Sequence, residues 1–317
     1  MATVKRLVYH IPGDADYTLD LSRDLTTVCR KLHRQKQTYT ILGGQLKESS
    51  GCVAYFKTAP HTWTTNTAIR RGFNIWRKAN REVYQKMDID SPKYSDFKVR
   101  LDSLHTSQRL LPAVLDATEQ GGPGIVNYSY GEWNYSTLVQ AKLLDLDGSG
   151  GLEYDDNADQ WDMHIVGAHT GNNEITTDNG YKFYRDLTSC GLIRSWFDSR
   201  SVPDAFEPNN SPTGTGGDKP GLYTDPLSNV FDVQDDDAEM AQIIETENDG
   251  APYDMLNVPG MNDGELQLVA FADNTAGEPD VVSIPGFQAP CGLVRITTEG
   301  NNGALLMLDV IAEGERI

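Results

Sequence analysis

An acidic stretch at residues 145–156, DLDGSGGLEYDD, has the spacing of a calcium-binding loop. Calcium prefers several oxygen ligands around a tight turn, taken from positions 1, 3, 5, 9 and 12 of a twelve-residue loop. Here Gly150 occupies the turn, and the candidate ligands are Asp145, Asp147, Ser149, Glu153 and Asp156. Asp156 stands where a longer Glu would bind through both oxygens, so affinity would be reduced. The alternative is an acidic hairpin tip, because Asp-Gly-Ser-Gly is also ordinary turn sequence.

Basic side chains form a second candidate site in the first hundred residues. Residues 66–87 carry apolar side chains at helical spacing, so they predict an amphipathic helix that Asn66 or Thr67 could cap. Residues 24–35 favour a shorter helix. Cations on helices can neutralise phosphates without reading base sequence. The candidate nucleic-acid-facing residues are Arg30, Lys31, Arg34, Arg70, Arg71, Arg77, Lys78 and Arg81. The alternative is a helix that packs on a sheet and keeps its charges in water.

The sequence lacks the usual catalytic motifs. It has no G-x-x-x-x-G-K-[ST] phosphate loop, no G-x-S-x-G nucleophile turn and no H-E-x-x-H zinc motif. His164 lies in an apolar stretch, which favours a buried strand histidine over a metal ligand. We therefore expect no enzyme; a hydrolase of an unrecognised β family would have only the abundant carboxylates in its favour. The isolated cysteines, which predict free buried thiols, are Cys29, Cys52, Cys190 and Cys291.

Charge is divided unevenly along the chain. The 317 residues have a formal net charge of −19. Residues 1–110 hold 19 Lys and Arg against 10 Asp and Glu, a net +9, and residues 111–317 hold 8 against 36, a net −28. This division indicates one surface for polyanions and one for solvent, although acidic loops alone could produce it. No run approaches the ~18 apolar residues of a membrane span, and no apolar signal-peptide core precedes Pro12.

The remaining pattern is one of short strands and long loops. Strands are predicted at 4–10, 17–22, 38–42, 51–57, 96–102, within 124–140 and at 265–272, with a Gly-Gly turn between the third and fourth. Asn-Gly pairs predict hairpins over 174–184 and 293–311. Together these elements predict a mostly β protein, a jelly-roll β-sandwich with an inserted amphipathic helix and long acidic loops. We expect a single elaborated domain over 1–317, with 203–250 as an acidic surface or projecting loop; two stacked jelly rolls are the alternative.

Several segments resemble capsid proteins of small circular single-stranded DNA viruses. They are YTLDLSRDLTTVCRKLHRQ at 17–35, TAPHTW at 58–63, AIRRGFNIWRKAN at 68–80, YSDFKVRLD at 94–102, NDGAPYD at 248–254 and CGLVRITTEGNNGALLMLDV at 291–310. The resemblance implies a jelly-roll subunit that self-assembles into an icosahedral shell around a genome. It implies a location in the virion, and in the host cell during assembly. The Arg-rich arm of many such proteins is missing, since only Lys5 and Arg6 precede Pro12.

The expected partners are further copies of the chain and viral nucleic acid, contacted without base specificity. Aromatic residues are common at subunit contacts, and Trp76, Trp133 and Trp196 are the candidates. A second reading is a calcium-dependent β-sandwich that binds carbohydrate, through the 145–156 loop and the aromatic residues at 128–135. No other cofactor is expected.

Overall fold

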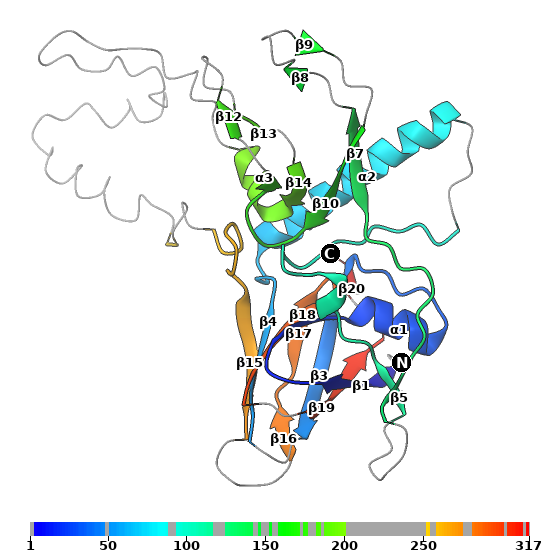
Figure 1. Ribbon diagram of the computed structural model, residues 1–317, viewed down its shortest axis with the longest axis vertical. Helices are drawn as coiled ribbons and strands as arrows, with labels where there is room; N and C mark the ends of the chain where they lie inside the picture. Colours follow the sequence, from blue (N-terminus) through cyan, green and yellow to red (C-terminus); the bar gives the residue numbers. More distant parts are fainter. Residues whose placement is uncertain are drawn as a thin grey trace, which may run out of the picture. The chain divides into compact units, whose positions relative to one another are not determined.

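The computed structural model describes residues 3–47, 51–87, 93–116, 124–141, 145–146, 152–153, 158–171, 174–176, 182–184, 187–200, 252–253, 258–274, 281–300, 303–312 and 315–316. The chain divides into one unit of residues 1–176, 182–201 and 259–317 and another of residues 177–181 and 202–258. The elements in Figure 1 belong to the first unit. Residues 203–250, predicted as acidic loops, lie outside the described residues.

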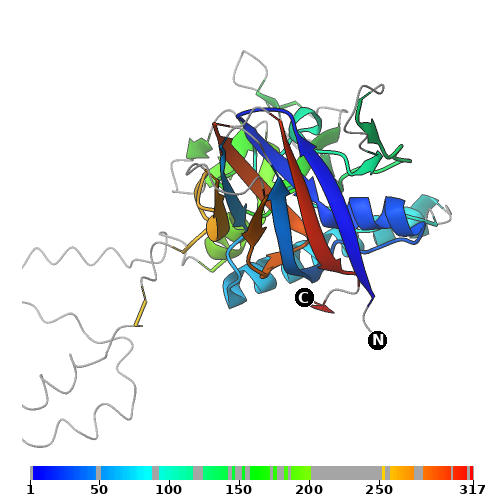
Figure 2. The same ribbon diagram turned by 90° about the horizontal axis from the view of Figure 1, so that it is seen from below.

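Two antiparallel sheets combine strands from both ends of the chain (Figure 1 and Figure 2). The first has the order β1 (Val4–Ile11), β19 (Ala304–Ile311), β3 (Gln37–Lys47) and β16 (Val281–Ile284), with β17 (Phe287–Pro290) and β20 (Glu315–Arg316) also pairing with β3. The second has the order β15 (Gln267–Asp273), β4 (Val53–Thr58), β18 (Leu293–Glu299) and β2 (Asp16–Asp20). The mostly β prediction is confirmed.

The apolar sides of these sheets share one core. Burial alternates along β4 and β19, as it must when one face of a strand is covered. The buried cluster takes residues from both sheets, and the rings of Phe56 and Phe287 lie 6.1 Å apart across it. Each fully buried large side chain contributes about 1.5–3 kcal/mol. The two sheets therefore form a β-sandwich.

The first helix begins and ends before its predicted bounds of 24–35. α1 spans Leu21–Cys29, because the Asp20 side chain accepts a hydrogen bond of 3.1 Å from the Arg23 N–H and caps the first turn. Arg30 then adopts a left-handed conformation, with φ 53° and ψ 31°, and ends the helix. The side chain of Arg30 is consequently presented at the end of α1.

The predicted Gly-Gly turn is wrong, because β3 runs straight through Gly43 and Gly44. A Cβ atom on Gly44 would lie 2.5 Å from the carbonyl oxygen of Met307, and one on Gly43 would lie 3.2 Å from that of Ile284. The neighbouring strands β19 and β16 thus approach β3 closely at this point. The glycines serve close backbone packing in the sheet, a second use of glycine that sequence does not separate from a turn.

The predicted hairpin over 293–311 is also wrong. β18 pairs with β2 and β4, whereas β19 pairs with β1 and β3, so the connection passes between the two sheets. Each strand buries its apolar face in the sandwich from the opposite side, which prevents the two from pairing. The hairpin over 174–184 is confirmed as an antiparallel pair of β12 (Glu174–Thr176) and β13 (Lys182–Tyr184).

A long segment between β4 and β15 carries the remaining elements. Its strands are β5 (Val114–Asp116), β6 (Val126–Asn127), β7 (Thr137–Ala141), β8 (Asp145–Leu146), β9 (Leu152–Glu153), β10 (Ala158–His164), β11 (Thr170–Gly171) and β14 (Leu187–Gly191), and its helices are α2 (Trp63–Met87), η1 (Ser107–Arg109) and α3 (Leu192–Asp198). A third sheet has the order β11, β14, β10, β7. Residues 96–102 form no regular strand, only a single bridge from Arg100 to His164.

The predicted amphipathic helix is confirmed in α2. It begins three residues early, where the Thr62 hydroxyl accepts the Thr65 N–H at 3.2 Å, so Thr62 is the cap and not Asn66 or Thr67. Gly72 makes room for α3, since a Cβ there would lie 2.8 Å from the Leu192 side chain. On the apolar face of α2, the Phe73 ring lies 5.7 Å from that of Phe97.

Candidate nucleic-acid interface

The predicted basic residues lie in α2 and in the segment 30–34 that follows α1, and all except Arg71 are exposed. Arg71 donates a hydrogen bond of 3.3 Å to the Ser195 carbonyl, so it helps to join α2 to α3. Arg70 and Lys78 line a shallow groove of about 360 Å³ beside Ile75, which is 44% exposed. The exposed face of α2 therefore offers cations next to an apolar side chain.

Lys36, which the sequence reasoning omitted, joins the two basic segments. Its ammonium lies 3.7 Å from the centre of the Phe73 ring on α2. Burial lowers the pKa of Lys36, and the nearby charges of Arg70 and Arg77 lower it further. The charges of Lys36, Arg70 and Arg77 are therefore close enough to act on one another, and these cations are called the basic surface below. Lys36 continues the run from Arg30 to Arg34, so the sequence did contain a signal for it.

Residues 94–98, which hold one acidic and one basic side chain, lie beside these cations. Burial raises the pKa of Asp96, while Arg34, Lys98 and Lys36 act in the opposite direction and hold the carboxylate in a cationic setting. The Lys98 ammonium lies 4.5 Å from the centre of the Trp133 ring, and burial lowers its pKa. Lys98 thus connects the cations to the aromatic segment at 128–135. Nothing in the sequence around Lys98 indicated this role.

Two buried carboxylates hold the aromatic segment against α1. Asp20 accepts hydrogen bonds from the Trp133 indole at 3.1 Å and the Tyr135 hydroxyl at 3.0 Å. Asp24 accepts one of 2.7 Å from the Tyr130 hydroxyl. Buried polar groups joined in this way fix one arrangement of the chain, because an unpaired member would be costly. The aromatic segment is therefore a fixed wall beside α1.

The charge of Asp24 is balanced by two kinds of partner. Arg23 lies 3.0 Å from its carboxylate, and the Tyr9 hydroxyl donates a further hydrogen bond of 2.7 Å. Burial is the largest influence and raises the pKa of Asp24 to about 6, although Arg23 and the two phenols oppose it. The Arg23 guanidinium also stacks over the Tyr130 ring at 4.1 Å. Arg23 is consequently a structural cation and little of its charge is free for a ligand.

His105 ends the same network in a neutral form. Its Nδ1 accepts the Leu101 N–H at 3.0 Å, and its Nε2 lies 3.0 Å from the Tyr135 hydroxyl. Burial, followed by Arg100 and Arg295, lowers the pKa of His105 to about 3. Arg295 itself pairs with Asp102 at 2.5 Å in the interior.

The other histidines of interest are held by hydrogen bonds. His164 Nδ1 bonds to the Ser189 hydroxyl, and its Nε2 lies 2.9 Å from the Ala168 carbonyl oxygen. This arrangement fits the predicted buried strand histidine. His169 Nε2 lies 3.3 Å from Asp198. Burial raises the pKa of Cys190 to about 12, so this thiol is not activated as a nucleophile.

The calcium-loop prediction falls mostly outside the described residues. Asp145 and Glu153 face each other in the antiparallel pair of β8 and β9, while Asp147, Ser149 and Asp156 are not described. Among the described residues, no group of three acidic, histidine or cysteine side chains could hold a metal ion. The strand pairing agrees with a hairpin, and calcium binding stays a prediction.

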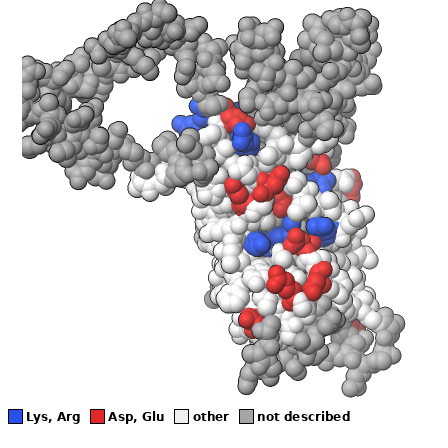
Figure 3. All heavy atoms as spheres, turned by 60° about the vertical axis from the view of Figure 1, so that its left-hand side comes forward, with Lys and Arg blue, Asp and Glu red and all other residues white. Residues whose placement is uncertain are grey.

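The tryptophans predicted at subunit contacts pack within the unit. Trp196 meets the exposed Trp63 edge to face at 5.2 Å, and Trp76 lies 5.7 Å from Phe97. The third, Trp133, bonds to Asp20 as described above. Figure 3 shows a face on which basic and acidic side chains lie close together. Charge on that face is mixed, so any separation of charge must involve other surfaces.

No protein-family model matches the chain, and no curated protein or solved structure matches it. Within the described part of the chain, no helix has both the length and the apolar composition needed to cross a bilayer. The function is therefore inferred from the residues and geometry of the chain itself.

Proposed function

We propose that the chain is the subunit of a self-assembling viral capsid with a jelly-roll core. The observation that carries the jelly-roll part of this proposal is the pairing order of the two sheets. In chain order, the strands are β1, β2, β3, β4, β15, β16 continued by β17, β18 and β19. β1 pairs with β19, β2 with β18, β3 with β16 and β17, and β4 with β15.

These pairs are those of one long antiparallel ribbon that is folded over on itself. The further pairs of β19 with β3 and of β18 with β4 wrap the ribbon into two facing sheets. A ribbon wrapped in this order is what a jelly roll requires, and jelly rolls occur in viral capsids, lectins and cupins. The order supports this assignment, with α2 and its neighbours inserted between β4 and β15.

The fold alone does not select one of these functions. The basic surface favours the capsid, because Lys36, Arg70 and Arg77 form a cationic area suited to phosphates without base recognition. The capsid-like sequence at 17–35 covers α1, and Arg30 and Lys31 add two exposed cations at the end of this helix. We assign the basic surface to the genome and the acidic later part of the chain to the outside of the shell.

Electron microscopy and light scattering of the purified full-length protein test the proposal. We expect closed particles of uniform diameter that contain nuclease-protected nucleic acid. A protein that stays monomeric at high concentration, over a range of salt and pH, would rule out the capsid. Uniform particles without nucleic acid would support the shell and remove the genome contact.

A further inference from the structure

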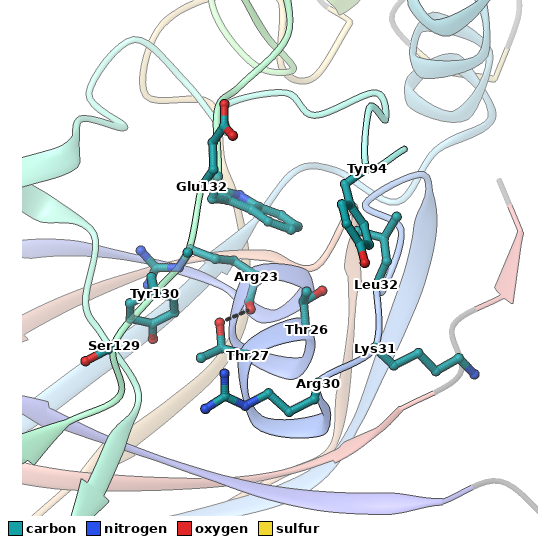
Figure 4. Close-up of a pocket in the computed structure, with 12 residues that line it drawn as sticks. Arg23, Thr26, Thr27, Arg30, Lys31, Leu32, Tyr94, Ser129, Tyr130 and Glu132 are labelled. Atoms are coloured by element: carbon teal, nitrogen blue, oxygen red, sulfur yellow. Dashed lines mark hydrogen bonds between the residues drawn. The ribbon is translucent and has the colours of Figure 1, made fainter. Parts of the chain in front are cut away.

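A pocket of about 250 Å³ opens at the C-terminal end of α1. Arg30 and Lys31 line it from the helix end, Tyr94 from the 94–98 segment, and Tyr130 and Trp133 from the aromatic segment. Figure 4 shows Tyr94 and Tyr130 on opposite sides, with the last turn of α1 between them. The pocket is small for a drug-sized ligand, so it suits one unit of a longer molecule.

The backbone at Arg30 is unusual for a residue with a side chain. Its φ of 53° lies in the left-handed region that glycine commonly occupies at a helix end. For other residues this conformation is unfavourable by about 1–2 kcal/mol. An arginine at such a position is explained if its guanidinium is needed at the pocket. Arg30 has no hydrogen-bond or ion-pair partner among the described contacts.

The charge at the pocket is positive overall. Arg30 and Lys31 are exposed, Lys93 lies with its ammonium 5.6 Å from the Tyr94 ring, and Glu132 is the acidic side chain in the described lining. The C-terminal end of α1 carries a partial negative charge, so its backbone would repel an anion. A phosphate must therefore be held by the side chains of Arg30 and Lys31.

The aromatic part of the pocket is available for stacking at Tyr94. This side chain belongs to a residue that is 65% exposed, whereas the Tyr130 ring already lies against Arg23. In single-strand binding, bases stack on exposed aromatic rings while nearby cations follow the backbone. Figure 4 shows the Lys31 side chain extending away from the other labelled residues, so it does not share the position of Arg30.

We infer that this pocket holds one nucleotide of a single-stranded nucleic acid, with its base on the Tyr94 ring and its phosphate paired with Arg30. Lys31 contacts the next phosphate along the strand. The inference rests on the proposed genome contact and assigns it to one site. If the protein binds oligonucleotides but forms no particles, the capsid proposal is refuted and the inferred nucleotide site still stands.

Fluorescence anisotropy with a short labelled oligothymidylate and full-length protein at nanomolar concentration tests the site. Tyr94→Ala should weaken binding by about 5- to 100-fold, and Tyr94→Phe should retain it, because only the ring is needed. Arg30→Gly should weaken binding about tenfold or more, and its salt dependence on a logarithmic scale should flatten by about 0.7. Arg109→Gln removes an exposed cation outside the pocket lining and should leave binding unchanged.

Two further measurements separate binding from folding. Glu132→Gln removes the acidic side chain and should strengthen binding several-fold, a gain that misfolding cannot produce. Arg30→Gly should keep or raise the melting temperature, because glycine readily adopts the left-handed backbone found at this position. Unchanged binding in both Tyr94→Ala and Arg30→Gly would overturn the inference. Equal competition by an abasic strand would refute stacking, and equal competition by thymidine monophosphate or inorganic phosphate would refute a strand as the ligand.

Discussion

Acid should weaken this fold through His105, which is buried close to cationic side chains. Its Nδ1 already accepts the Leu101 N–H, so a proton on that atom would break the hydrogen bond. Burial, Arg100 and Arg295 also oppose a positive charge, and the pKa falls to about 3. The imidazole therefore stays neutral in the folded protein at pH values where it is charged in the unfolded chain.

The size of the effect follows from the two pKa values. An unfolded histidine has a pKa of about 6.5, so between there and about 3 the unfolded chain binds one more proton than the folded protein. The free energy of unfolding then falls as pH falls, by about 1.4 kcal/mol for each unit. From pH 7 to pH 5 the loss is about 2 kcal/mol.

Urea unfolding of wild type and His105→Gln at these two pH values measures the effect. Glutamine offers an acceptor oxygen and a donor NH2 group but does not titrate, so the variant should lose about 2 kcal/mol less than wild type on acidification. His61→Gln, at an exposed histidine, should behave as wild type. Equal losses in wild type and His105→Gln would refute the reasoning. The Tyr135 hydroxyl contact makes the aromatic wall of the interface sensitive to the same proton.

Three other predictions concern separate features. Asp24 acts in the opposite sense, because its raised pKa of about 6 makes the folded protein bind the proton more tightly than the unfolded chain does. As the pH falls from 7 to 3.5, wild type should gain about 3 kcal/mol of stability relative to Asp24→Asn, measured by urea unfolding. Gly44→Val would force a Cβ to 2.5 Å from the Met307 carbonyl and should lower stability by about 3 kcal/mol, seen as a lower melting temperature, whereas Gly13→Ala meets nothing within 4 Å and should be neutral. Calorimetry should show heat of calcium binding at millimolar concentration that Asp145→Ala abolishes; no heat in wild type would remove the calcium site.

The local sequence was sufficient to predict secondary structure where a residue pattern is compatible with only one kind of element. The apolar spacing in α2 indicated a helix because three to four residues per turn is a period that no strand shares. The strand after Gly264 followed from β-forming residues behind a turn. The basic residues predicted on α2 lie on its exposed side for the same reason, except Arg71, which bonds to the Ser195 carbonyl.

The same reasoning failed where two structures share a pattern. Gly43 and Gly44 could make a turn or admit a close neighbour, and only the approach of β19 shows which applies. The connection that contains Gly303 could close a hairpin or pass from one sheet to the other. The partners of β18 and β19 show that it passes between the sheets. Lys98 and Tyr94 belong to the candidate interface, but they lie in a segment that forms no helix or strand, so no periodic pattern indicated their position.

The sequence by itself determined the β character, the amphipathic helix and the uneven charge, because these depend on residue types and spacings within short windows. The tertiary structure alone decided the pairing of distant strands and the meeting of Lys36 with α2. It also decided the burial that shifts the pKa values of Asp24 and His105. Those properties depend on which residues become neighbours in space, and the free energy that selects the neighbours comes from a core to which both ends of the chain contribute.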